Sequence, residues 1–178
     1  MLLKIKYHTA AVIKKMVYHL LYGRQLSFGR GTTFRSGFHL MIEKPGCVQI
    51  GDHCFFNHGC SINCIHKIQI GENTIFGEGV RIYDHNHRFS DPSKEIREQG
   101  YATSTVQIGS HCWIGSNVVL LRKAKIGDHC VIGAGCVINE EIPADSLVVP
   151  ATRCLRIELI TKNRGDTNAQ IVRDNGSL

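Results

Sequence analysis

Residues 108–138 read IGSHCW, IGSNVV, LLRKAK, IGDHCV and IGAGCV when written in sixes, with Ile138 opening a further unit. An aliphatic residue opens every unit, Gly follows in four of the five, and the fifth place holds a small or short side chain. IGSHCW IGSNVV and IGDHCV IGAGCV lie 18 residues apart, so three units form a longer period. This repeat predicts a parallel β-helix in which each unit is a short strand and a corner, and three units complete one coil.

The places within a unit have different predicted environments. The opening aliphatic residue points inward and stacks on its equivalents in the coils above and below. The fifth place also faces inward, where a bulky group would overfill the narrow prism. Gly in the second place relieves crowding at the corner, where we expect a positive φ. The remaining places face water and accept polar residues.

Eight Cys and ten His raise the question of a zinc site, which the repeat phase answers. The fifth place is the predicted core position, and it is occupied by Cys54, Cys60, Cys112, Cys130 and Cys136. The fourth place, which we expect to face solvent, is occupied by His53, His111 and His129. Because no CxxC pair occurs, we predict no metal site.

Length and charge restrict the class of protein. One compact domain is the default for 178 residues, and a net charge of +6 with a pI near 9.0 suits an anionic ligand or a membrane surface. No nucleic-acid-binding motif is present, so we expect no nucleic-acid partner. No apolar run approaches about 20 residues, so no transmembrane helix is expected. The absence of a cleavable signal and the predicted burial of the thiols favour a cytoplasmic location.

Three segments organise the chain: a helical cap over residues 1–25, a β-helix over 26–149 and a C-terminal extension over 150–178. Residues 3–22 have helical spacing, with Lys among the apolar positions. This helix either closes the open end of the coil or lies against anionic lipid headgroups. The repeat is interrupted over 83–106 by a long polar excursion, which is typical of either a functional loop or a disordered one.

His85 and His87 lie outside the repeat phase, at the root of this excursion. An imidazole has an unperturbed pKa of about 6.5, which allows it to act as a general base at neutral pH. Two other interpretations remain open from the residues alone, namely a pair of solvated loop histidines and a His-x-His metal site.

From about Ile50 to Pro150, the motifs resemble the hexapeptide-repeat acyltransferases, most closely the sugar and xenobiotic O-acetyltransferases. The resemblance implies a left-handed β-helix, a homotrimer whose active sites are each shared by two subunits, and acetyl-CoA as co-substrate. An essential histidine of the family follows a unit like FGEGVRI. Counting ungapped from IGENTI places it at His87, with His85 as the alternative. In the family, this base takes the proton of an acceptor hydroxyl, which then attacks the thioester.

Further site residues follow from the same resemblance. Asn57 matches a position that lines the acceptor pocket, and we assign Asp84 to the same pocket. The second nitrogen of the catalytic imidazole also needs an acceptor partner, and either the nearby Asp84 or a backbone carbonyl would serve. The family contacts coenzyme A through WIGS and IGAG units and through basic residues after a C-terminal turn. The matching residues are Trp113, Ser116, Ala134, Arg153 and Arg156. The sugar enzymes also use an acidic acceptor residue that is absent around residues 63–65, so we expect a different acceptor.

These features together predict a coenzyme A-dependent O-acetyltransferase acting on a hydroxyl of a sugar or glycan, in particular a cell-surface polysaccharide, with peripheral membrane contact through the basic helix. Two alternatives stay open. One is N-acylation of a nucleotide-linked amino sugar, which uses the same fold and base. The other is a non-catalytic or carbonic-anhydrase-like β-helix, which would need three zinc-binding histidines placed across subunits.

Overall fold

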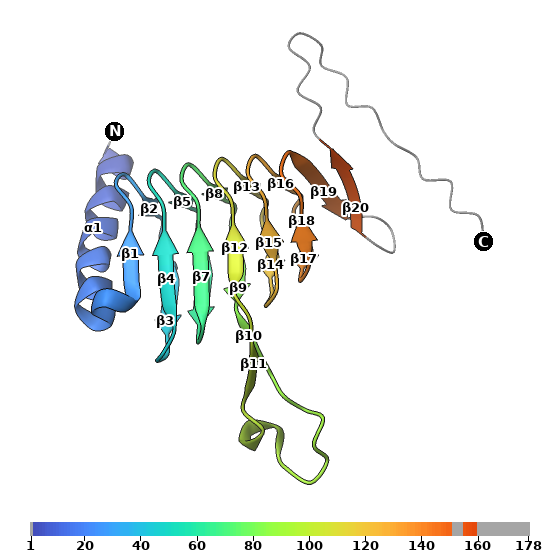
Figure 1. Ribbon diagram of the computed structural model, residues 1–178. Helices are drawn as coiled ribbons and strands as arrows, with labels where there is room; N and C mark the ends of the chain where they lie inside the picture. The colour runs from blue at the N-terminus through green and yellow to red at the C-terminus, as the bar shows by residue number, and fades with distance from the viewer. Residues whose placement is uncertain (1, 151–154, 160–178) are drawn as a thin grey trace.

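The computed structural model describes residues 2–150 and 155–159, with side chains from residue 9 to residue 150. The chain is a left-handed parallel β-helix with a helix across one end, which confirms the predicted fold class (Figure 1). Three sheets form the sides of a prism, and each coil adds one strand to each side. The strands of neighbouring coils are therefore about 4.8 Å apart along the prism axis.

The strands of the first sheet are β1 (Leu26–Phe28), β4 (Cys47–Ile50), β7 (Lys67–Ile70), β12 (Val106–Ile108), β15 (Lys125–Ile126) and β18 (Glu141–Ile142). Those of the second are β2 (Thr33–Phe34), β5 (Phe55–Phe56), β8 (Ile75–Phe76), β13 (Trp113–Ile114), β16 (Val131–Ile132), β19 (Ser146–Pro150) and β20 (Leu155–Leu159). Those of the third are β3 (His39–Ile42), β6 (Ser61–Cys64), β9 (Arg81–Tyr83), β14 (Val119–Leu120) and β17 (Val137–Ile138). Within these sheets β20 pairs antiparallel with β19, and the other described pairs are parallel.

The register places equivalent residues of successive units on top of one another. Ile50 pairs with Ile70, Ile70 with Ile108, and Ile108 with Ile126. All four side chains are buried, so the opening residues of the units form the continuous apolar column that the repeat predicted.

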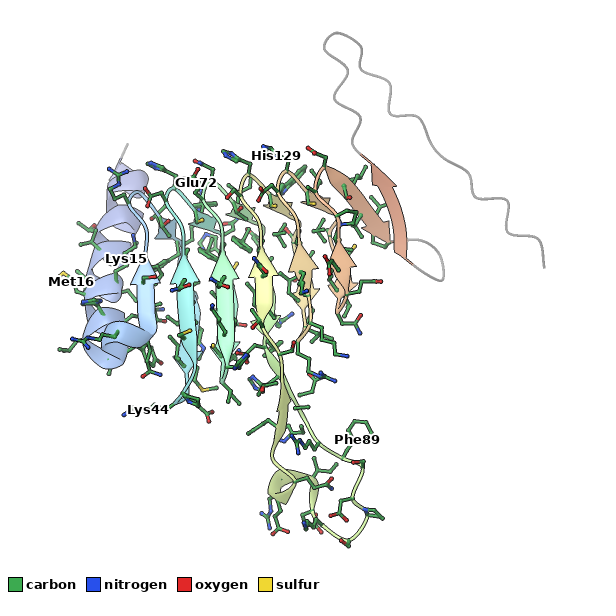
Figure 2. The ribbon with its side chains drawn as sticks, viewed as in Figure 1. Lys15, Met16, Lys44, Glu72, Phe89 and His129 are labelled. Atoms are coloured by element: carbon green, nitrogen blue, oxygen red, sulfur yellow. The ribbon has the colours of Figure 1, made fainter. Side chains whose placement is uncertain are left out.

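A corner follows each sheet. In the second coil, the first corner covers residues 51–54 and the second corner covers residues 57–60. The third corner returns the chain to the first sheet, as residues 43–46 do between the first and second coils. In Figure 2, His129 lies at the first corner and Lys44 at the third.

Positive φ values occur at the fourth place of the unit, which corrects the expectation for the second. The non-Gly residues with positive φ are His53, Asn73, His111, Asn117, Lys123, His129 and Asp145, all in fourth places. Asn, Asp and His tolerate this region better than other side chains, which explains why exposed histidines recur there. Gly is required in the second place for a different reason, which is the close approach of the next coil. A Cβ on Gly71 would lie 2.5 Å from the backbone nitrogen of Ser110 in that coil.

The fifth-place residues are buried as predicted, and several also link one coil to the next. Cys54 Sγ donates a hydrogen bond to Gly71 O at 3.0 Å, and Thr74 Oγ1 donates to Gly109 O at 2.9 Å. Equivalent thiol donors are Cys60, Cys112 and Cys130. The cysteines are therefore small core residues whose thiols also satisfy carbonyl groups of the following coil.

The helix α1 (Leu2–Tyr22) and the short 3₁₀ helix η1 (Gly23–Gln25) lie across the first coil. Ala11 and Tyr18 of α1 are buried against it, and Tyr18 meets the ring of Phe38 edge-on at 6.2 Å. The ammonium groups of Lys14 and Lys15 also point to the coil, where they donate to backbone carbonyl oxygens. The predicted cap is confirmed. No helix in the described part of the chain is long and apolar enough to span a bilayer.

The excursion predicted over residues 83–106 forms a hairpin arm rather than an unstructured loop. Strand β10 (His85–His87) pairs antiparallel with β11 (Tyr101–Thr103), and a 3₁₀ helix, η2 (Ile96–Glu98), lies farther out. Figure 1 shows this arm leaving the prism at the third corner, after β9. The arm places two histidines at the junction between a regular coil and an extended segment.

Candidate active site

Asp84 anchors the root of the arm. Its side chain has no exposed surface, and its carboxylate accepts hydrogen bonds from the backbone N–H groups of Ile65 (3.0 Å) and His66 (2.7 Å) in the preceding coil. The Cys64 thiol donates to the same group at 3.1 Å, and His85 Nδ1 lies 2.9 Å from Asp84 Oδ1. The carboxylate therefore joins the arm to the coil below it.

The charge of Asp84 is stabilised by these donors. Burial by itself raises the pKa of the carboxyl, but hydrogen bonds from Ile65 N–H, His85, Cys64 and His66 N–H outweigh it and hold the pKa below its usual range. Because Asp84 is fully buried, it holds His85 rather than touching an acceptor. This corrects its assignment to the acceptor pocket.

His85 is fixed in orientation by this contact. With the carboxylate ionised, Nδ1 carries the proton that is donated to Asp84, so in the neutral ring Nε2 carries the lone pair. The side chain is 14% exposed, and the rings of Tyr83 and Tyr101 meet it edge-on at 6.4 and 5.2 Å. His85 is thus oriented but largely enclosed.

His87 lies two residues farther along β10, on the same face of the strand as His85. Its ring is 4.6 Å from that of Tyr101, its cross-strand partner, and its side chain is exposed. Tyr101 therefore lies beside both imidazoles, although the sequence analysis did not select it. The signal for it was weak, because the pairing of β10 with β11 is not visible in the repeat.

A hollow of about 210 Å³ lies at the root of the arm and is lined by Asn86, His87, Arg88, Phe89, Ser90, Ala102 and Arg122. Arg122 comes from the next coil, where it lies two residues beyond the pair formed by Ile82 and Leu120. Its Nε atom is buried and has no hydrogen-bond partner among the described residues. Arg122 is thus a second residue that the sequence analysis missed, and it could donate to an acceptor oxygen in this hollow.

The residues assigned to coenzyme A lie mostly along the second corner. Trp113 is on β13 with its side chain 55% exposed, and Ala134 follows β16 in the next coil, also exposed. Ser116 follows β13, and its hydroxyl accepts a hydrogen bond from the backbone N–H of Glu78 at 3.2 Å. Exposed indole and small corner residues form an edge that an extended ligand can approach closely.

Asn57 lies at the same second corner, two coils before Trp113. Its Oδ1 accepts the backbone N–H of His58 at 2.9 Å, so part of this side chain supports the corner itself. Of the two assigned arginines, Arg153 lies outside the described residues. Arg156 is on β20, where its backbone pairs with Val149, and the description of β20 does not extend to side chains.

The predicted site residues therefore form two groups at different corners of one chain. The histidines and Asp84 follow β9 at the third corner, whereas Asn57, Ser116 and Ala134 follow strands of the second sheet. A strand of the third sheet separates these corners by about 10–13 Å, at roughly 3.3 Å per residue. Across residues 9–150, no three His, Cys, Asp or Glu side chains converge as metal ligands would.

Comparison with known proteins agrees with this fold. Residues 105–140 match the family described as bacterial transferase hexapeptide (six repeats). Nodulation protein L of Rhizobium meliloti (strain 1021) is 37% identical over 122 residues, which cover 68% of this chain and 64% of that protein. The chain spans less than two thirds of the curated relatives that it matches first.

Two solved structures are similar over most of the chain. One is a hexapeptide-repeat acetyltransferase of Vibrio cholerae O1 biovar eltor, complexed with acetyl-CoA, with a TM-score of 0.66 and 26% identity over 82% of this chain and 75% of that one. The other is a maltose O-acetyltransferase of Clostridium difficile 630, with a TM-score of 0.61 and 25% identity over 78% of this chain and 72% of that one.

Proposed function

We propose that this chain, which belongs to the hexapeptide-repeat acyltransferase superfamily, transfers an acetyl group from acetyl-CoA to a hydroxyl of a sugar or glycan. One observation carries the proposal: an arm interrupts a regular coil and holds an exposed imidazole, His87, at its root. The acetyl-CoA bound to the Vibrio cholerae enzyme supports the donor, and the maltose O-acetyltransferase supports the acceptor class.

In the proposed reaction, His87 takes the proton of the acceptor hydroxyl. The oxygen attacks the thioester carbonyl carbon, the tetrahedral intermediate collapses, and the carbon–sulfur bond breaks. The imidazolium then returns its proton to the departing coenzyme A thiolate, so no covalent enzyme intermediate forms. A positioned base of this kind contributes a factor of about 10²–10⁴ to the rate. Donors to the developing oxyanion contribute much of the remainder.

We assign the base to His87 because its ring is open to an acceptor, whereas His85 is enclosed between Asp84 and two tyrosine rings. His85 then acts as a positioning residue that holds β10 against the coil. His85 with Asp84 is the second candidate base, since that pair already fixes a lone pair on Nε2.

The proposed enzyme is a homotrimer. Its base lies at the third corner and its coenzyme A edge at the second. In the proposed trimer, a neighbouring chain brings these two surfaces together. The flat sides of a triangular prism suit packing around a threefold axis. We place Trp113, Ser116 and Ala134 on the chain that supplies the coenzyme A edge, with Arg153 and Arg156 as candidates for its phosphates.

The acceptor that we propose is a cell-surface polysaccharide or its precursor. Cys64, near the position where the sugar enzymes use an acidic residue, is buried and donates to Asp84, so it is engaged in anchoring the arm.

We also propose a cytoplasmic location. Free thiols at all seven cysteines that the structure describes support a reducing compartment.

The test is steady-state acetyl transfer, followed as thiol release from acetyl-CoA with a panel of maltose, simple galactosides and amino sugars. His87→Ala should lower kcat by about 10²–10⁴ while leaving the KM for acetyl-CoA unchanged. His85→Ala should lower it less, by about 10-fold, because it loosens the arm without removing the base. Mild alkali distinguishes the product classes, since it cleaves an O-acetyl ester but leaves an N-acetyl amide intact.

His129→Ala is the matched control, because this exposed histidine lies at the first corner, away from the arm (Figure 2). It should retain full activity. Full turnover by His87→Ala together with loss of activity in His85→Ala would move the base to the Asp84–His85 pair. Full turnover by both variants would exclude a histidine base.

A further inference from the structure

The outer face of α1 is apolar, which is the reverse of an ordinary surface helix. From residue 9 onward, the large apolar side chains that the helix exposes are Val12, Ile13, Met16, Val17, Leu20 and Leu21. They recur at intervals of three and four residues and so form one continuous stripe. Leu20 is 87% exposed and Met16 is 64% exposed, which are large values for side chains of this kind.

Two lysines in the middle of this helix point the other way. Lys14 and Lys15 donate to the carbonyl oxygens of Phe38 and Thr32 in the first coil, and burial lowers the pKa of both ammonium groups. Figure 2 shows Lys15 on the side of α1 that faces β1, with Met16 on the opposite side. Lys14 and Lys15 therefore help to close the coil, while the apolar stripe stays outside.

The same end of the molecule carries all of the excess positive charge. Residues 1–42, which include α1 and the first coil, contain seven Lys and Arg and no Asp or Glu. Residues 43–178 contain fourteen Lys and Arg against fifteen Asp and Glu. The net charge of +6 thus arises entirely from the capped end.

We propose that this end docks on the surface of an anionic lipid bilayer, with the apolar stripe of α1 buried at the level of the headgroups. An apolar helix face combined with a basic surround binds such surfaces through buried apolar area and through attraction to anionic lipid. A hollow of about 580 Å³ beside the stripe, lined by Met16, Leu20, Leu26 and Phe28 among others, offers room for part of an acyl chain.

The positive charge around α1 favours an anionic lipid surface, rather than a second copy of this chain, as the partner of the apolar stripe. Two capped ends packed face to face would oppose two segments of net charge +7, in each of which Arg30 is offset by Asp52 of the second coil and the remaining excess is still positive. An anionic surface neutralises the same charge. Because the coil axis stands roughly perpendicular to α1, docking would hold the root of the arm, in the third coil, about 10 Å beyond the first coil.

The test is flotation of the intact chain with vesicles. We expect the chain to float with phosphatidylcholine vesicles containing about 30% phosphatidylglycerol, and to float far less with phosphatidylcholine alone. Raising NaCl from about 0.1 M to about 0.5 M should weaken binding to the anionic vesicles. The double substitution Met16→Ser with Leu20→Ser should reduce binding at least about 10-fold, because it removes apolar area from the stripe.

Ile96→Ser is the matched control, since it removes an exposed apolar side chain from the arm instead, and it should leave flotation unchanged. Both variants should keep the melting temperature and gel-filtration volume of the parent. Failure of the parent chain to float with anionic vesicles would overturn the proposal. So would a fall in oligomer size on double substitution without any vesicle binding by the parent, which would make the stripe an interface between copies. Acetyl transfer to a soluble acceptor reports on the catalytic proposal separately.

Discussion

At the scale of single residues, one buried carboxylate organises the root of the arm. Asp84 collects donors from two backbone amides, a thiol and an imidazole, of which three come from the preceding coil. An ionised carboxylate with this many donors is satisfied although it is removed from water. The same contacts orient His85 and hold β10, so the position of His87 depends on a group that does not touch it.

Asp84→Asn should therefore destabilise the chain by about 1–3 kcal/mol at neutral pH, because it replaces a charged acceptor opposite two N–H groups. The folded-state pKa of Asp84 lies below its unfolded value, so its contribution to stability is present above about pH 4 and is lost as the pH falls through the folded value. The difference in melting temperature between parent and variant should be largest near pH 7 and should shrink below about pH 4. A constant difference across this range would contradict the assigned charge.

At the scale of the repeated unit, each place serves one geometric need. The fourth place turns the chain through positive φ, the second place lets backbones of successive coils approach, and the fifth place fills the interior and donates to the next coil. The space available at the second place differs from one unit to another. A Cβ at Gly71 would lie 2.5 Å from Ser110 N, whereas a Cβ at Gly133 would meet Val148 O at 3.0 Å.

Gly71→Ala should consequently lower the free energy of unfolding by about 1–3 kcal/mol, since the backbone of the next coil must move to admit the methyl group. Gly133→Ala, at the second place of a later unit but on the second corner, should have a smaller effect because its neighbours lie farther away. Thermal unfolding monitored by circular dichroism compares the two. Equal losses would mean that close approach does not select glycine at the second place.

Three of the fifth-place thiols, those of Cys54, Cys60 and Cys136, should be unreactive in the native state. Burial raises the pKa of Cys60 to about 11, and it also raises the pKa of Cys54 and of Cys136. Since the thiolate is the reactive form, DTNB at pH 8 should label these cysteines only after denaturation, and a half-buried thiol such as Cys47 should react first. Rapid native labelling of Cys60, located by peptide mass spectrometry, would contradict the packing.

At the scale of the whole molecule, the fold separates three surfaces. The arm leaves the third corner, the exposed indole and small residues lie along the second, and the apolar stripe of α1 covers one end. Within one chain, a full side of the prism lies between the first two surfaces. In the trimer that we propose, every copy would offer its arm to one neighbour and its second corner to the other.

Mixing inactive chains tests this arrangement. His87→Ala and Trp113→Ala, each impaired alone, should regain activity when co-expressed with different tags and purified as mixed trimers. One site in roughly three would then combine an intact His87 from one chain with an intact Trp113 from its neighbour. Mixed species no more active than their parents would place both residues in a site built within one chain.

Much of this architecture was available from the sequence because a repeat is a local property. The period of six predicted the coil, its inward column, the buried cysteines and the exposed histidines, and the break in the period located the arm. The prediction that the second place has a positive φ was wrong. The repeat shows where Gly recurs, but it does not show whether Gly is required there by its own backbone conformation or by the close approach of the next coil.

The sequence by itself thus determined that the chain is a capped β-helix with two histidines out of phase. Tertiary structure alone decided that Asp84, rather than a backbone carbonyl, holds His85, and that Tyr101 and Arg122 lie at the root of the arm. It also decided that α1 turns Lys14 and Lys15 inward and its apolar stripe outward. The physical reason is distance along the chain. The donors that hold Asp84 come from a different coil, and the carbonyls that attract Lys14 and Lys15 exist only after the first coil has closed.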